Sequence, residues 1–101
     1  MLTDKTDIEK RIVENAKQLK ALGASRIGVF GSFVRNEANA KSDVDLLVEF
    51  APGEKNFRNY TALYSFLTEL FKRKVDFLTP ESLSPYLADK ILKEVEYVYI
   101  H

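Results

Sequence analysis

Cysteine is absent from the 101-residue sequence, and histidine occurs only once. Without cysteine the chain forms neither a disulfide framework nor a thiolate metal site, which fits a reducing compartment. The single histidine is His101, the last residue, where we expect no catalytic role. These absences favour a cytoplasmic protein over a secreted, disulfide-stabilised one.

An excess of one charge sign is also missing, because 15 Lys and Arg residues balance 15 Asp and Glu residues. Such a chain lacks the overall basic surface with which proteins hold nucleic acid by its phosphates, although a local patch is compatible with it. No apolar run approaches the roughly 18 residues of a membrane span. We therefore expect no membrane contact and no strong binding of nucleic acid, and a polymerase or tRNA-modifying role is least favoured.

Hydrophobic residues make up 46% of the chain, which suits one core at this length and leaves little room for a second. No repeat, low-complexity tract or linker interrupts the sequence. We expect residues 1–101 to form a single domain, and the sequence leaves open whether that domain forms a homo-oligomer.

Apolar periodicity predicts strands that alternate with helices. The expected strands are residues 26–30, 44–50 and 74–79, with a short fourth strand at 97–100. The expected helices are residues 6–22, with a capping box at Thr6 and Glu9 and a stop at Gly23, then 56–74, a turn after Pro80, and 85–94. The fold class is α/β (α+β): a small mixed sheet of three to four strands with helices packed on it.

One apolar stripe runs along the expected helix at 56–74, and we assign it to the core rather than to a cofactor. Its members are Phe57, Tyr60, Leu63, Tyr64, Leu67, Leu70 and Phe71.

Two aspartates, Asp43 and Asp45, stand at alternate positions where the buried strand over 44–50 begins. Strand side chains alternate, so both carboxylates project from one face of the sheet. Burying a carboxylate costs several kcal/mol unless it is paired or bound to a cation. Asp76, in the strand over 74–79, joins them if the two strands are neighbours. Carboxylates placed in this way hold pairs of Mg²⁺ ions in phosphoryl-transfer enzymes, so the pattern favours a divalent-metal site.

Gly31 and Ser32 follow the strand over 26–30 and form a candidate phosphate site. We expect Ser32 to cap a short helix, so that its hydroxyl and free backbone N–H groups point out of the strand end. Arg35, one helical turn on, could balance phosphate charge but is equally compatible with a structural ion pair. Lys41 is a weaker candidate for the same role.

At these residues the sequence resembles a known family. "GSFVR" followed by "SDVDLLVEF", with a third aspartate in "KVDFLTPESL", looks like the DNA polymerase beta-type nucleotidyltransferases, whose signature places Asp-x-Asp shortly after Gly-Ser; ten residues separate Ser32 from Asp43 here. The short length and the tail "TPESLSPYLADKILKEVEYV" resemble the minimal nucleotidyltransferase (MNT) proteins over nearly the whole chain. Asn36 follows Arg35 where the family often has glycine, and Asn tolerates the left-handed backbone that such a loop uses.

The resemblance implies a polymerase beta-like fold in which Asp43 and Asp45 bind two Mg²⁺ ions. Asp76 would complete the triad and orient or deprotonate the acceptor hydroxyl, and Gly31 and Ser32 would hold the phosphates of a nucleoside triphosphate, usually ATP. MNT proteins commonly act as antitoxins of HEPN-family toxins, which are RNases, and silence them by adenylylating a hydroxyl, commonly of tyrosine. The implied function is Mg²⁺-dependent transfer of AMP from ATP to such a partner.

Two other functions stay open. A non-catalytic antitoxin would only bind its partner, and a transferase of the aminoglycoside-modifying kind would act on a small hydroxylated compound. Larger nucleotidyltransferases use a further domain to hold the base and the acceptor, and this chain has no residues for one, which favours an acceptor site built partly by another chain. Candidate contacts are the loop 51–57 and the tail with Tyr86, Tyr97 and Tyr99, whereas the basic run 72–74 is expected to be a solvated helix end.

Overall fold

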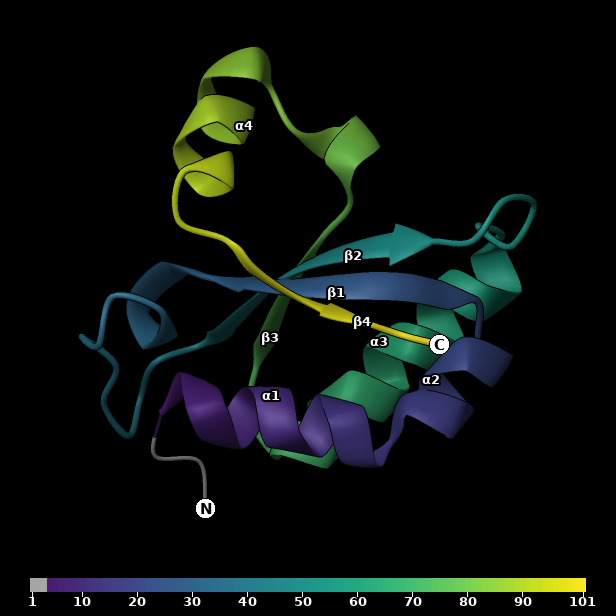
Figure 1. Cartoon of the computed structure of the whole chain (residues 1–101), viewed down its shortest axis with the longest axis horizontal. Helices are drawn as coiled ribbons and strands as arrows, with labels where there is room; N and C mark the ends of the chain where they lie inside the picture. The colour runs from purple at the N-terminus through teal and green to yellow at the C-terminus, as the bar shows by residue number, and fades with distance from the viewer. Residues whose placement is uncertain (1–3) are drawn as a thin grey trace.

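The computed structural model describes residues 4–101 and arranges four strands in one mixed sheet (Figure 1). The strands are β1 (Ala24–Phe30), β2 (Val44–Phe50), β3 (Val75–Leu78) and β4 (Glu96–Tyr99), in the order β3-β2-β1-β4. β1 is antiparallel to β2 and β4, whereas β2 and β3 are parallel. The parallel pair requires a crossover, which α3 (Phe57–Phe71) provides. The predicted α/β fold with a small mixed sheet is confirmed.

The helices divide unequally between the two faces of the sheet (Figure 1). α1 (Lys5–Glu14), α2 (Ala16–Ala21) and α3 cover one face, which we call the covered face. The 3₁₀ turn η2 (Pro80–Ser82) and α4 (Pro85–Leu92) lie over part of the other, which we call the open face. No helix within residues 4–101 has the length and apolar character that crossing a bilayer requires.

Alternation along β2 distributes its side chains between these two faces. Val44, Leu46 and Val48 are fully buried in the main core beneath the helices of the covered face. Leu47 points to the open face and packs in a smaller, separate cluster with Phe30 and Ile91. The open face therefore has less apolar packing and leaves space for polar chemistry.

The first helical segment differs from the prediction over residues 6–22. The helix begins after Asp4, whose carboxylate accepts a hydrogen bond from the Asp7 backbone N–H at 3.1 Å, so the predicted cap at Thr6 is wrong. Asn15 interrupts the helix, because its side-chain amide donates to the Arg11 carbonyl at 2.8 Å and competes with the backbone. Gly23 follows α2 with φ +95°, in agreement with the predicted stop.

The apolar stripe of α3 is buried only in its C-terminal part. Leu63, Leu67 and Phe71 belong to the main core, as predicted. Phe57 is 84% exposed because it is the first residue of α3, more than a turn before the buried part begins. Tyr60 and Tyr64 are partly exposed and pack their ring faces and edges against Phe77 of β3.

Candidate active site

The structure brings the three predicted aspartates together at one end of the sheet. Asp45 of β2 pairs with Asp76 of β3 in the parallel register, so both side chains belong to the same face. Asp43 directly precedes β2 and, two residues from Asp45, lies on that face as well. Asp45 is half-buried and Asp76 is exposed. Asp43, like Asp45, is partly buried, so Asp76 is the most exposed carboxylate of the three.

Asp45 lies in an environment that disfavours its charged form. Burial, followed by the charges of Asp76 and Asp43, raises the pKa of Asp45 from 3.8 to about 6. The backbone N–H of Ser32 and the guanidinium of Arg35 act in the opposite direction. A carboxylate held beside two like charges gains most from a cation bound among them.

The chemistry of the three side chains fits a magnesium site, because carboxylate oxygens are the ligands that Mg²⁺ prefers. Within the described part of the chain, however, no three His, Cys, Asp or Glu side chains already converge on one point. The ammonium of Lys74 lies 3.9 Å from Asp43 Oδ2 and is largely exposed. The aspartates are therefore a set of neighbouring donors, and side-chain rotation would be needed for them to share an ion.

The Gly31–Ser32 turn lies directly beside Asp45. Gly31 has φ +78° and begins the 3₁₀ turn η1 (Gly31–Phe33). The prediction that Ser32 caps a helix is wrong, because Ser32 lies inside this turn and the cap position is Phe30. A Cβ at Gly31 would collide with the Asp45 carboxylate. Glycine is therefore required twice, for its backbone conformation and for the close approach of this carboxylate.

The groups expected to hold phosphate are already occupied by carboxylates. The Gly31 N–H donates to Glu94 Oε2 at 2.6 Å, so it is not free as expected. Arg35 donates through Nη1 to both oxygens of Glu94, at 3.0 and 3.1 Å, and through Nε to Glu37 at 2.9 Å. Of the two roles considered for Arg35, the structure contains the ion pair.

The loop between η1 and β2, which leads to the aspartates, contains a residue with left-handed backbone conformation. Asn36 has φ +59°, which confirms that asparagine supplies the left-handed residue where the family often has glycine. Lys41 is exposed, and its backbone N–H donates to the Asn39 side chain at 2.8 Å.

Arg73 is a positioning residue that the sequence did not reveal. Its guanidinium donates to the carbonyls of Asn39 and Ser42, at 3.0 and 2.8 Å, and lies 5.3 Å from the centre of the Phe33 ring. The prediction of a solvated helix end is therefore wrong for this residue. The one signal in the sequence is that Arg73 lies shortly before the strand that carries Asp76, while Ser42 directly precedes Asp43.

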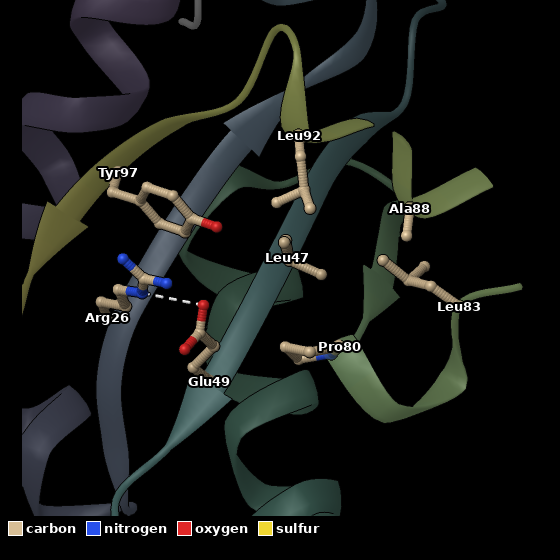
Figure 2. A pocket seen from close by; sticks show the side chains of 8 residues that line it. All are labelled: Arg26, Leu47, Glu49, Pro80, Leu83, Ala88, Leu92 and Tyr97. Atoms are coloured by element: carbon tan, nitrogen blue, oxygen red, sulfur yellow. Dashed lines mark hydrogen bonds and ion pairs between the residues drawn. The ribbon is translucent and has the colours of Figure 1, made fainter. Parts of the chain in front are cut away.

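A cavity opens on the open face further along β2 (Figure 2). Arg26 and Glu49 form an ion pair at its rim, with 2.8 Å between Nε and Oε2. The Arg26 guanidinium stacks 3.7 Å from the centre of the Tyr97 ring, so Tyr97 is a packing residue, whereas Tyr86 is 81% exposed. The other lining residues are Leu47, Pro80, Leu83, Ala88 and Leu92.

Fold and site together define the class: a mixed sheet with carboxylates at one end beside a Gly-Ser turn is the architecture of nucleotidyltransferases. A model of the nucleotidyltransferase domain matches residues 9–98, and the chain belongs to this family.

Among relatives, the protein adenylyltransferase MntA of Thermococcus cleftensis is 38% identical over 93 residues, which are 91% of this chain and 93% of the relative. A solved structure assigned to the minimal nucleotidyltransferases superposes with a TM-score of 0.77 at 32% identity, covering 93% of this chain and 95% of the other. A chain in the solved complex of tri-AMPylated Shewanella oneidensis HEPN toxin with MNT antitoxin shares the fold, with a TM-score of 0.56, 18% identity, and coverage of 88% and 72%.

Proposed function

We propose that this protein is a Mg²⁺-dependent adenylyltransferase that transfers AMP from ATP to a hydroxyl on a partner protein, with a HEPN toxin as the class of partner. The observation that carries the proposal is the pairing of Asp45 with Asp76 beside the Gly31–Ser32 turn. The name of the Thermococcus relative and the fold shared with the HEPN–MNT complex support the choice of nucleotide and partner.

In the proposed reaction the acceptor hydroxyl oxygen forms a bond to the α-phosphorus of ATP. The bond from that phosphorus to the oxygen bridging to the β-phosphate breaks, and pyrophosphate leaves with the electron pair. Asp43, Asp45 and Asp76 would hold Mg²⁺, which when bound neutralises phosphate charge and makes the hydroxyl more acidic. Asp76, the exposed member, orients the incoming hydroxyl and accepts its proton.

The other residues act by position rather than by covalent chemistry, as in phosphoryl transfer generally. Gly31 and Ser32 bind the β- and γ-phosphates and hold the departing pyrophosphate. Arg73 fixes the loop before Asp43 and so limits the orientations of that carboxylate. Because ATP is a cytoplasmic substrate, we place the reaction in the cytoplasm.

The test uses ATP labelled at the α-phosphate, Mg²⁺, this protein and the product of the adjacent gene. We expect label on the partner with the wild type and none with the Asp43→Asn, Asp45→Asn double variant. Asp89→Asn is the matched control, because Asp89 is an exposed aspartate of α4 that is not a member of the triad. Omitting Mg²⁺ should also prevent labelling.

Two other results would replace the proposal. A partner that is bound and silenced but stays unlabelled would identify a binding antitoxin on a transferase fold. Label found on a small hydroxylated compound without any protein partner would identify a small-molecule nucleotidyltransferase.

A further inference from the structure

Glu94 binds the Gly31 backbone N–H, which the proposed function assigns to phosphate, and the Arg35 guanidinium, which the sequence offers as a further candidate for that role. Its carboxylate accepts the Gly31 backbone N–H at 2.6 Å and the Arg35 guanidinium at 3.0 and 3.1 Å. A guanidinium and a backbone N–H are the donors that proteins use for phosphate oxygens as well as for carboxylates. The site therefore already holds an anion that belongs to the chain itself.

The contact of Glu94 with Gly31 joins residues that are far apart in the sequence. Glu94 lies between α4 and β4 and is 63 residues from Gly31. Its side chain is only 22% exposed, so the carboxylate is partly desolvated and its hydrogen bonds are stronger than those of a surface pair. Such a contact has to be broken before another anion can use the same donors.

The helix that precedes Glu94, α4, packs on the sheet through a small part of the core, whereas β4, which follows Glu94, pairs with β1. On the open face, Ile91 of α4 packs with Phe30 and Leu47, separately from the main core. The cavity of Figure 2 lies beside this cluster, between β2 and the α4 residues Ala88 and Leu92. Glu94 itself belongs to neither apolar cluster, so rotation of its side chain would remove no core contact.

We propose that Glu94 competes with the phosphates of the nucleotide for Gly31 and Arg35, so that the affinity for nucleotide is set by the displacement of this side chain. The inference rests on the proposed function, which takes Gly31 to bind phosphate, and it adds Arg35 to that phosphate site. A different role for Glu94, holding Arg35 and Gly31 in the arrangement that the nucleotide needs, predicts a change of opposite sign.

Replacing the carboxylate by its amide separates the two roles. Glu94→Gln keeps the size of the side chain and an oxygen acceptor for the Gly31 N–H, but removes the charge that pairs with Arg35. If Glu94 competes with phosphate, this variant binds a triphosphate about tenfold more tightly than the wild type, because charge-assisted bonds are about twice as strong as neutral ones. If Glu94 is a positioning residue, the variant binds it more weakly.

The experiment is calorimetric titration of the full chain with ATP and with inorganic tripolyphosphate, at fixed ionic strength and with Mg²⁺ present. Tripolyphosphate lacks the base and the ribose, so a tightening seen with both ligands locates the effect at the phosphate groups. Glu37→Gln is the matched control, because Glu37 also pairs with Arg35, at 2.9 Å, and its side chain is 64% exposed. We expect this control to change affinity less than about twofold.

Glu94→Ala is the second variant, because it removes the carboxylate without introducing an amide. Equal or weaker triphosphate binding by both folded variants would overturn the inference. Failure of the proposed function has a different signature: the wild type and the variants bind ATP in the expected order, yet none transfers AMP to the partner.

Discussion

The side chains on the two faces of β2 differ in burial and in chemical character. Val44, Leu46 and Val48 are all fully buried against the helices of the covered face. Between them on the open face lie Asp45, half-buried and beside two further aspartates, and Leu47, in a small apolar cluster. Burial of alternate residues on the covered face holds the strand in place. This burial offsets the free-energy cost of a partly buried carboxylate on the open face.

The largest expected effect is on chemistry at the open face. Asp45→Asn should lower the rate of AMP transfer at least about 1,000-fold, equivalent to about 4 kcal/mol in the barrier, because an amide binds Mg²⁺ far less well than a carboxylate. Rates of label transfer under single-turnover conditions measure it. Asp89→Asn should leave the rate unchanged, and an active Asp45→Asn enzyme would exclude the assigned site.

The next effect is on the stability of the covered face. Leu46→Ala should lower the free energy of unfolding by about 3 kcal/mol, because Leu46 is fully enclosed in the main core and the cavity cannot relax. Leu47→Ala should cost less, about 1 to 2 kcal/mol, because Leu47 already lines a cavity on the open face (Figure 2). Urea denaturation of both variants gives the comparison, and equal losses would show that the two faces pack equally well.

A smaller difference should separate two glycines that have nearly the same backbone conformation. Gly31 has φ +78° and Gly53 has φ +79°, so alanine at either position carries a similar backbone strain of about 1 to 2 kcal/mol. Nothing lies within 4 Å of a Cβ at Gly53, whereas one at Gly31 meets the Asp45 carboxylate. Gly31→Ala should therefore lower the free energy of unfolding by at least about 1 kcal/mol more than Gly53→Ala.

Thermal or urea unfolding measures this difference, and Gly53→Ala serves as the control for strain alone. Equal losses for the two variants would mean that Asp45 moves away from an added methyl group at no cost, and that the close approach of Gly31 is not a constraint.

The elements that sequence predicted well are those specified by a local pattern. β2 has the predicted bounds, because a β-rich run with only Asp45 and Glu49 among its apolar residues lies between a polar segment and a Pro-Gly turn. The meeting of Asp43, Asp45 and Asp76 followed from strand alternation and one assumption, that the two strands are neighbours. Their role as metal ligands stays a prediction.

The features that sequence missed depend on contacts between distant segments. Glu94 binds Gly31 and Arg35, and Arg73 binds the carbonyls of the loop before Asp43, but no periodicity or spacing connects these positions. The cap of the first helix failed for a different reason. Two suitable residues, Asp4 and Thr6, lie two positions apart, and the local pattern does not choose between them.

The smallest effect, on the stability of the metal-free protein, sharpens the contrast between the two faces. The pKa of Asp45 is raised from 3.8 to about 6, so between these values the folded state binds more protons than the unfolded state. The contribution of this group to stability is therefore present below pH 3.8 and is lost as the pH rises through about 6. With allowance for solvent screening of a half-buried group, the loss is at most about 1 kcal/mol.

Asp45→Asn cannot ionise at this position, so the variant should gain stability relative to the wild type as the pH rises from 4 to 7. Urea denaturation with a chelator present measures the free energy of unfolding of both proteins at each pH, and Asp89→Asn is the control for a change of net charge. Adding Mg²⁺ at pH 7 should stabilise the wild type and not the variant, because a bound cation offsets the repulsion among the three carboxylates. A difference between wild type and Asp45→Asn that stays constant with pH would mean that Asp45 is ionised without penalty, and that the open face tolerates three carboxylates without a cation.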